Sequence, residues 1–171
     1  MRVLDKAQAL LALEAEVRAL PPGVDCIACA LVTPGDATAE PIAESEHGVV
    51  VVNRFASRER HLLVVARHHV EHIHQLAWPV YADLQHLAFQ AVCVLQARFR
   101  PVRIYTSVLG SSTQLATSYP HLHVHVVPVM DADDRARPAR VFSWSEGVFV
   151  YDAAEAEALA AELRSHWPDT A

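Results

Sequence analysis

Hydrophobic residues recur at helical spacing in three stretches of the chain. The first begins after Asp5, a typical N-cap residue, and stops at a PPG triplet. The second covers residues 79–99 and ends at Pro101, and the third follows Asp152, which forms a capping-box pattern with Glu155. The pattern predicts three amphipathic helices, whose apolar stripes are Leu10, Leu13, Val17 and Leu20; Leu84, Leu87, Ala88, Ala91 and Leu95; and Ala156, Leu159, Leu163 and Trp167.

Shorter apolar runs between these helices predict β-strands. Residues 48–53 (GVVVVN) and 61–66 (HLLVVA) are continuous and apolar, which is typical of buried strands, and we expect them to pair as antiparallel neighbours across a connector. Further strands are predicted at 26–32 (CIACALV) and 102–110, and a bent strand or hairpin at 141–151. The chain therefore reads as one α+β domain over residues 1–171, an antiparallel β-sheet flanked by helices.

Residues 120–128, PHLHVHVVP, alternate imidazole with aliphatic side chains. In a β-strand, side chains two positions apart lie on the same face. The aliphatic set is then expected to face a core, while His121, His123 and His125 form a row on the other face. Imidazole titrates near neutral pH and is the commonest metal ligand. The row therefore indicates proton chemistry, nucleophilic chemistry or metal binding.

Composition narrows the class of protein. The 171 residues are 52% hydrophobic and fit one domain with a substantial core. The formal net charge of −6 argues against a general nucleic-acid binder, which requires a basic face. No apolar run is long enough for a membrane span, and the N-terminus does not resemble a signal peptide. We expect a cytoplasmic protein with no membrane or nucleic-acid partner.

Three cysteines are present, and the odd number argues against a disulfide framework. Cys93 lies in an apolar run and is expected to be a small buried hydrophobe. Cys26 and Cys29 form a CxxC pair, which suits a zinc site, a redox centre or two buried thiols.

The histidine row supports three hypotheses. The histidines could be zinc ligands of a metallohydrolase, although no acidic residue lies in the row or in the loop before it to act as base. One histidine could instead be a nucleophile toward phosphorus, with its neighbours binding oxyanions. The third hypothesis is a non-catalytic metal-binding or regulatory module. The small residues of the loop 111–120 favour the nucleophile, because their N–H groups and hydroxyls suit a phosphate.

The pattern HLHVHVV resembles that of the histidine triad (HIT) superfamily of nucleotide hydrolases and transferases. The resemblance extends over roughly residues 24–130 and includes the CxxC, the strand–turn–strand VVVNRFASRERHLLVV and the small-residue loop before the histidines. It implies a HIT-like fold with a motif-bearing core. The C-terminal extension, residues 131–171, has no counterpart in that pattern, and its segment 141–151 is expected to cover the pocket or to serve a dimer interface.

The resemblance also implies roles for four residues. His123 is the expected nucleophile, which attacks the α-phosphorus of a nucleotide derivative and carries a covalent nucleotidyl group. His125 and Ser118 are expected at the phosphate and the leaving group, and Asn53 at the ribose. The substrate could be a nucleoside phosphoramidate, a dinucleoside polyphosphate or a nucleotide sugar, and a homodimer is expected.

Zinc is the cofactor that the resemblance implies, in a structural site formed by Cys26, Cys29, His69 and His121, with His68 as the rival of His69. The alternative function is a catalytically silent, zinc-holding nucleotide-binding module. Residues 116–118 (ATS) favour that alternative, because they replace the Gly-Gln-Ser of many family members and remove its glutamine.

Overall fold

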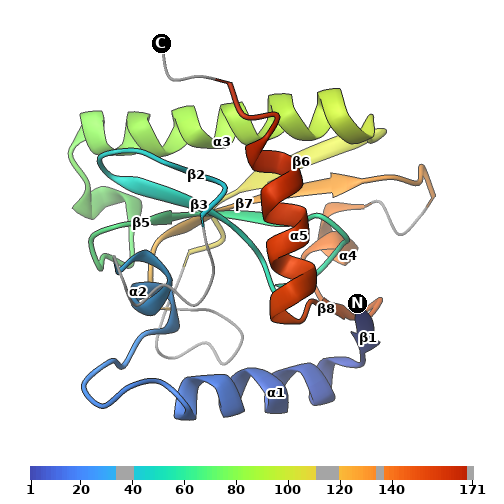
Figure 1. Ribbon diagram of the computed structural model, residues 1–171, viewed down its shortest axis with the longest axis horizontal. Coiled ribbons are helices and arrows are strands. Elements are labelled where there is room, and N and C mark those ends of the chain that lie inside the picture. Colours follow the sequence, from blue (N-terminus) through green and yellow to red (C-terminus); the bar gives the residue numbers. More distant parts are fainter. Residues whose placement is uncertain (34–40, 111–119, 134–136, 169–171) are drawn as a thin grey trace.

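The computed structural model describes residues 1–33, 41–110, 120–133 and 137–168 (Figure 1). Its elements are, in chain order, β1 (Arg2–Leu4), α1 (Lys6–Arg18), α2 (Ile27–Val32), β2 (Ala43–Glu44), β3 (Gly48–Val52), β4 (Phe55–Ala56), β5 (Leu62–Ala66), a 3-10 turn (Ile73–Gln75), α3 (Trp78–Phe99), β6 (Arg103–Ser107), β7 (His123–Val129), α4 (Pro138–Val141), β8 (Val148–Val150) and α5 (Ala153–Arg164). The three predicted amphipathic helices are confirmed as α1, α3 and α5.

A five-stranded antiparallel sheet forms the centre of the molecule, in the order β2-β3-β5-β7-β6. The predicted pairing of the two apolar runs is confirmed, with Val50 opposite Val64. Strand β7 lies between β5 and β6, and its His125 is opposite Leu63. The histidine-bearing strand is therefore held on both edges, which restricts the motion of its side chains.

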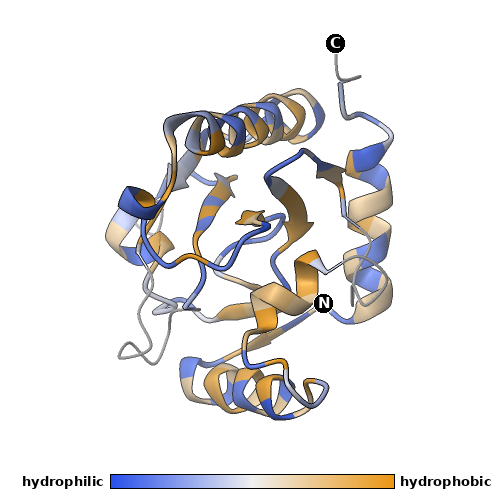
Figure 2. Ribbon diagram, turned by 90° about the vertical axis from the view of Figure 1, so that its left-hand side faces the viewer, coloured by the Kyte–Doolittle hydropathy of each residue, from blue (hydrophilic) through white to orange (hydrophobic). Residues whose placement is uncertain are grey.

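The two faces of this sheet pack against different helices. One face buries Val50, Val64 and Val126 in a core shared with α3 and α5, and the strands of Figure 2 are correspondingly hydrophobic (orange). Helix α3 packs closely here, because a Cβ on Gly48 would lie 2.6 Å from Leu84 Cδ2. The opposite face carries α2 over Val65, together with the side chains of His123 and His125. His123 and His125 thus lie on the face away from α3.

A second, three-stranded sheet joins both ends of the chain, in the order β1-β8-β4. Helix α1 packs on it through Ala9, which contacts a cluster containing Phe55, Val148 and Val150. Asp5 caps this helix as predicted, accepting a hydrogen bond from the Gln8 N–H. The sheet itself was not predicted, because strands of two or three residues carry no readable periodicity.

Two of the sequence predictions concerning cysteines are wrong. Residues 26–32 form no strand: Ile27–Val32 is the helix α2, and Cys26 is its N-cap. On a helix, residues three apart share one face, so Cys26 and Cys29 point the same way, whereas a strand would separate them. Cys93 is exposed on α3 instead of being buried.

Other predicted strands are shorter than expected. The hairpin predicted over 141–151 is a helix end and a turn followed by the short strand β8. The strand predicted at 102–110 ends at Ser107, and the histidine strand begins only at His123. The antiparallel sheets with their covering helices confirm the α+β class. None of the helices in the described part of the chain is long and apolar enough to cross a membrane.

Candidate functional site

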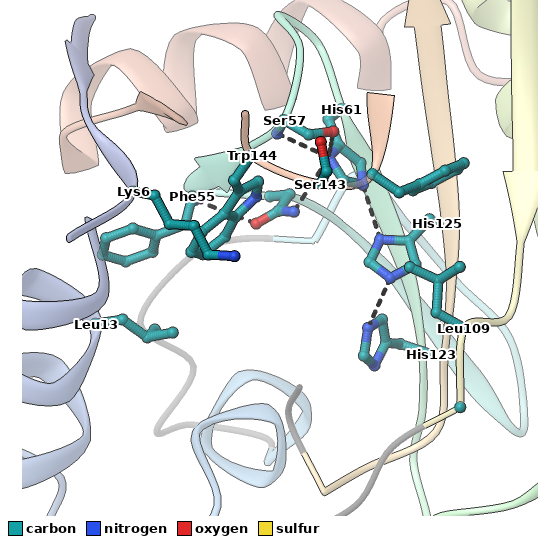
Figure 3. Close-up of a pocket in the computed structure, with 13 residues that line it drawn as sticks. Lys6, Leu13, Phe55, Ser57, His61, Leu109, His123, His125, Ser143 and Trp144 are labelled. Atoms are coloured by element: carbon teal, nitrogen blue, oxygen red, sulfur yellow. Dashed lines mark hydrogen bonds between the residues drawn. The ribbon is translucent and has the colours of Figure 1, made fainter. Parts of the chain in front are cut away.

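A cavity of about 310 Å³ lies where the two sheets and α1 meet (Figure 3). Its lining includes His123 and His125 from β7, together with His61 just before β5. The opposite wall comes from both ends of the chain, through Lys6 and Trp144. The remaining lining residues are Leu13, Asn53, Phe55, Ser57, Leu109, Gly110, Phe142 and Ser143. The cavity thus unites the predicted strand with Asn53, with residues of the segment 141–151 that was expected to cover the pocket or to serve a dimer interface, and with Lys6 and Leu13 of α1, to which the sequence alone assigned no role in a site.

The three histidines of the row do not share one environment. His123 and His125 lie on the cavity face of β7, whereas His121 precedes the strand and is fully buried. The His121 ring is turned toward Cys26 and Cys29, and its backbone carbonyl accepts a hydrogen bond from His123 Nδ1–H at 2.7 Å. His121 therefore links the cysteine cluster to His123, which lines the cavity.

A chain of hydrogen bonds connects the rings of His61, His125 and His123. The backbone groups at its two ends determine which nitrogen of each ring carries the proton. At one end the Ser57 backbone N–H can only donate, so His61 Nδ1 accepts it at 3.3 Å and His61 Nε2 carries the proton. His61 Nε2–H then donates to His125 Nδ1 at 3.0 Å. His125 Nε2–H in turn donates to His123 Nε2 at 3.1 Å.

The other end of this chain agrees with that direction. The carbonyl of His121 can only accept, so His123 carries its proton on Nδ1 and has its lone pair on Nε2. Asn53 supports the first ring, since its Nδ2 lies 3.3 Å from His61 Nδ1 while its Oδ1 accepts the Phe55 N–H. The network thus fixes the proton of His123 on Nδ1 and its lone pair on Nε2, which accepts the His125 Nε2–H beside the cavity.

Burial keeps these imidazoles neutral. Desolvation, followed by the nearby His123, lowers the pKa of His61 to about 3. Desolvation also lowers the pKa of His123, against the opposing effect of its hydrogen bond to the His121 carbonyl. The pKa of His125 lies well below its ordinary value, because of burial and then its neighbours His61 and His123. At neutral pH, His123 therefore retains its lone pair.

We expect the protein to lose stability below about pH 6.5, the ordinary pKa of a histidine in an unfolded chain. Below that pH, His61 and His125 bind protons in the unfolded chain but not in the folded protein, because burial lowers their pKa values in the folded state. Their contribution is complete above pH 6.5 and declines as the pH falls toward the folded values, by up to about 1.4 kcal/mol per pH unit for each group. Urea denaturation at pH 7.5, 6.0 and 5.0 measures the free energy of unfolding at each pH and so its decline.

The variant His61→Gln provides the comparison for that series. It removes one of the buried histidines whose pKa is lowered, so its free energy of unfolding should depend less steeply on pH than that of the wild type. Parallel slopes for the two proteins would show that His61 is not the group responsible.

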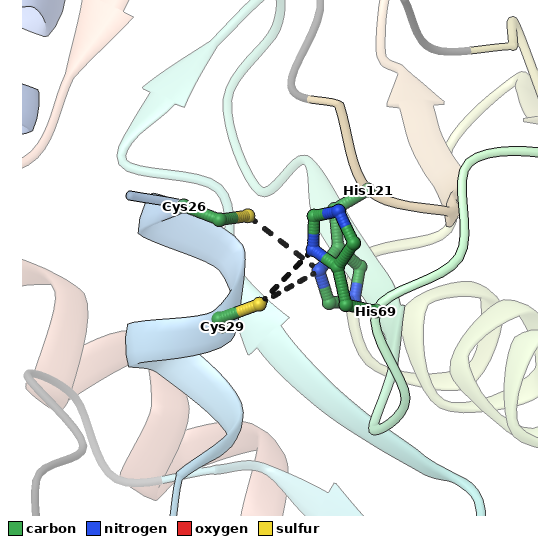
Figure 4. A group of neighbouring side chains, drawn as sticks. All are labelled: Cys26, Cys29, His69 and His121. Atoms are coloured by element: carbon green, nitrogen blue, oxygen red, sulfur yellow. Dashed lines mark hydrogen bonds between the residues drawn. The ribbon is translucent and has the colours of Figure 1, made fainter. Parts of the chain in front are cut away.

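Four side chains from distant parts of the chain form a second cluster, which contains Cys26, Cys29, His69 and His121 (Figure 4). Their ligand atoms all lie within 4.8 Å of one another. Cys29 Sγ is 3.2 Å from His69 Nδ1 and 3.4 Å from His121 Nδ1, and Cys26 Sγ is 3.6 Å from His121 Nδ1. Tetrahedral zinc with usual bond lengths would place sulfur and nitrogen ligands about 3.5 Å apart. The donor set and its spacing therefore fit zinc.

The surroundings of the cluster also suit a cation. His121 Nε2–H donates to the Ala66 carbonyl at 2.6 Å, which leaves the Nδ1 lone pair facing the sulfurs. Burial, and then the neighbouring Cys26, raises the pKa of Cys29 to about 11, so thiolates here need a positive charge beside them. Of the two rival histidines, His69 lies within the cluster and His68 does not.

Of the remaining predicted residues, Asn53 lines the cavity. The other histidines His72, His74 and His86 are exposed. Ser118 lies outside the described residues. Lys6, Leu13, Phe142 and Trp144 were not predicted as site residues, although the sequence holds one signal: Lys6 is the only lysine in the chain.

Comparison with solved structures returns proteins of the same fold. A hypothetical histidine triad nucleotide-binding protein from Sulfolobus tokodaii is 17% identical, with a TM-score of 0.63 over 82% of this chain and 90% of that one. A zinc-bound histidine triad family protein from Mycobacterium smegmatis is 21% identical, with a TM-score of 0.57 over 82% and 96%. At these identities the likeness shows the HIT fold alone.

A third structure is diadenosine triphosphate hydrolase from Plasmodium falciparum, which is 16% identical, with a TM-score of 0.58 over 74% of this chain and 75% of that one. No curated protein matches the chain. The model of the HIT domain family matches residues 35–131, which include β7, the cavity histidines and two members of the cysteine cluster. Since this match spans more than half of the chain, the protein belongs to the HIT domain family.

Proposed function

We propose that the protein is a nucleotide hydrolase or nucleotidyl transferase that acts at an α-phosphate through a covalent nucleotidyl-histidine. The observation that carries this proposal is the orientation of His123. Its Nδ1–H is held by the His121 carbonyl and its pKa is lowered by burial, so its lone pair lies on Nε2, where it accepts the His125 Nε2–H at the cavity that both rings line. A neutral, fixed imidazole nitrogen is a competent nucleophile toward phosphorus.

In the first step, the Nε2 lone pair of His123 forms a bond to the α-phosphorus. The bond from phosphorus to the leaving group breaks, and its electron pair departs with that group. The His125 Nε2–H, which points at His123 in the structure, would turn to a phosphoryl oxygen and stabilise its developing charge. His61 supports this role as a positioning residue, because its Nε2–H keeps the proton of His125 on the cavity side.

In the second step, water or another acceptor attacks the phosphorus, and the P–N bond to His123 breaks. The electron pair returns to Nε2, so the ring is restored and a nucleoside monophosphate or its transfer product leaves. Asn53, between His61 and Phe55, is the proposed ribose ligand. Ser118 is the proposed hydroxyl near the leaving group. The leaving group itself stays open among amines, polyphosphates and sugar phosphates.

Zinc bound by Cys26, Cys29, His69 and His121 completes the proposal as a structural cofactor. The four donors would fill a tetrahedral site, so the metal would serve to hold the cluster together and not to activate water. His121 would then bind the metal through Nδ1, while its backbone carbonyl accepts the hydrogen bond from His123 Nδ1–H. The zinc-bound state of the related M. smegmatis protein supports the same metal here.

A substrate panel tests the enzymatic proposal. Adenosine and guanosine phosphoramidates, diadenosine polyphosphates and nucleotide sugars are each incubated with the protein, and released nucleoside monophosphate is measured by chromatography. Rapid acid-free quenching and peptide mass analysis should place a transient nucleotidyl group on His123. If nucleotides bind but no substrate releases monophosphate, the protein is the alternative, a catalytically silent zinc-holding nucleotide-binding module.

A homodimer is part of the proposal, and the edge of the larger sheet supports it. Within the described residues, β6 pairs with β7 alone, so its outer edge offers backbone groups to a second copy. The exposed Phe89 of the adjacent helix α3 could add apolar contact area. Light scattering after size-exclusion chromatography should give twice the chain mass of 18.8 kDa. A mass equal to one chain would contradict the dimer.

A further inference from the structure

One end of the cavity is built largely by residues outside the family match. Lys6 and Leu13 come from α1, and Trp144 comes from the turn before β8, where they meet Phe55 of β4. In Figure 3 the labelled side chains of Lys6, Phe55 and Trp144 lie together, across the cavity from His123. We call these four residues the aromatic end.

Trp144 is held in this place by an unusual backbone. Its φ angle is +59°, in the left-handed region that non-glycine residues rarely adopt. The turn closes with a Gly147 N–H···O=C Trp144 bond of 3.3 Å, and a Cβ on Gly147 would lie only 2.8 Å from Val3 Cγ1. The turn is therefore pressed against β1. A strained conformation that keeps an indole at a cavity wall is typical of a functional site.

Lys6 is distinctive in both sequence and structure. Arginine occupies the thirteen other basic positions of the chain, so this cavity holds its only lysine. Among the described residues, the Lys6 side chain has no ion pair or hydrogen bond, and it is exposed. Its ammonium is a compact donor on a flexible stem, which suits contact with a small acceptor on a ligand.

Asn53 joins this end to the histidines. Its Oδ1 accepts the Phe55 N–H and its Nδ2 lies 3.3 Å from His61 Nδ1. If Asn53 binds the ribose, as the proposed function holds, the phosphate lies toward His123 and the base lies toward Phe55 and Trp144. We infer that the aromatic end is a guanine-selective base site, in which Trp144 stacks on the nucleobase and Lys6 donates to guanine N7 and O6. This inference rests on the proposed function.

The chemistry of the aromatic end favours a base over a phosphate. Leu13, Phe55 and Trp144 offer apolar surface, which a planar base covers and a hydrated phosphate does not. Guanine presents two adjacent acceptors, N7 and O6, where a lysine can donate. Adenine presents an amino donor beside N7, which opposes an ammonium. The Lys6 ammonium therefore favours guanine over adenine.

Calorimetric titration with GMP, AMP and CMP tests both residues. The wild type should bind GMP more tightly than AMP. Trp144→Leu should weaken GMP binding by about 5- to 150-fold, corresponding to the loss of one stacked base, whereas Trp144→Phe should retain most of the affinity. Lys6→Met should abolish the preference for GMP over AMP. Trp78→Leu, at a 74% exposed tryptophan of α3, is the matched control and should bind GMP like the wild type.

Ribose 5-phosphate separates this inference from the proposed function. It should shift the NMR signals of the His123 and His125 rings equally in the wild type and in Trp144→Leu, which also shows that the variant is folded. If GMP shifts these signals but Trp144→Leu binds GMP normally, the base site is elsewhere. If Lys6→Met weakens GMP and AMP alike, Lys6 binds phosphate and the base assignment is wrong. If neither GMP nor ribose 5-phosphate shifts the histidine signals, the proposed function fails as well.

Discussion

His123→Ala should reduce the release of nucleoside monophosphate from the best substrate by about 10⁴-fold or more. The expectation follows from covalent catalysis: without Nε2, no residue of the hydrogen-bonded row is oriented to form the first bond to phosphorus. Substrate affinity should change far less, because the ribose and base ends of the cavity remain. Single-turnover kinetics with saturating protein measure the chemical step directly.

Two further variants make this result interpretable. His123→Asn removes Nε2 but keeps an N–H close to the position of Nδ1, so it can still donate to the His121 carbonyl. It should be as inactive as the alanine variant but more stable, since an unpartnered buried carbonyl costs about 1–3 kcal/mol. His86→Ala, at an exposed histidine of α3, should be fully active. Substantial turnover by His123→Asn would assign the nucleophile to another residue.

The central sheet could be predicted from the sequence because its signals are local. Runs such as residues 48–53 and 61–66 are apolar throughout and short, and β7 alternates strictly. The β-branched residues of the two runs favour strands that are buried on both faces, and the alternation of β7 puts His123 and His125 on one face of the sheet. For these strands, tertiary contacts set the exact ends but do not change the secondary structure.

The helix α2 could not be predicted in this way. CIACALV is apolar throughout, and neither helical nor strand periodicity distinguishes its positions. The helix places both cysteines on one face beside His69 and His121, which are remote in the sequence, so the contacts that accompany it are not visible in the segment itself. The choice of His69 over His68 has the same origin, because adjacent residues point in different directions and a sequence does not say which one faces the cluster.

The aromatic end of the cavity shows a second limit. It forms when β1 and β4 pair with β8, which brings residues near 6 and 144 together across nearly the whole chain. Strands this short are decided by contacts between distant segments and not by intrinsic propensity. The segment 141–151 was therefore expected to cover the pocket or to serve a dimer interface, but its aromatic residues suited a core as well as a site.

Cys26→Ser should lower both bound zinc and stability. A serine hydroxyl is a poor replacement for a thiolate at zinc, and the remaining donors would leave an incomplete site. Because the proposed metal would link α2 to the segments that carry His69 and His121, its loss should reduce the free energy of unfolding by about 3–5 kcal/mol. Elemental analysis and calorimetry, with and without a chelator, measure the two effects together.

Cys93→Ser is the matched control, since Cys93 is an exposed cysteine on α3, outside the cluster. It should keep its metal and its melting temperature. Cobalt(II) added to the metal-free wild type should produce the absorption of tetrahedral cobalt-thiolate, and Cys26→Ser should weaken that absorption. If the wild type is purified without zinc, gives no such absorption and is insensitive to chelators, the zinc proposal is wrong.

Cys26→Ser also distinguishes a structural metal from a catalytic one. Four protein donors leave zinc no open position for water, so the metal should influence turnover only through His121, whose carbonyl holds the His123 Nδ1–H. Cys26→Ser should therefore retain measurable release of monophosphate at temperatures where it is folded, while His123→Ala should not. Equal loss in both variants would contradict the purely structural role that we propose for the metal.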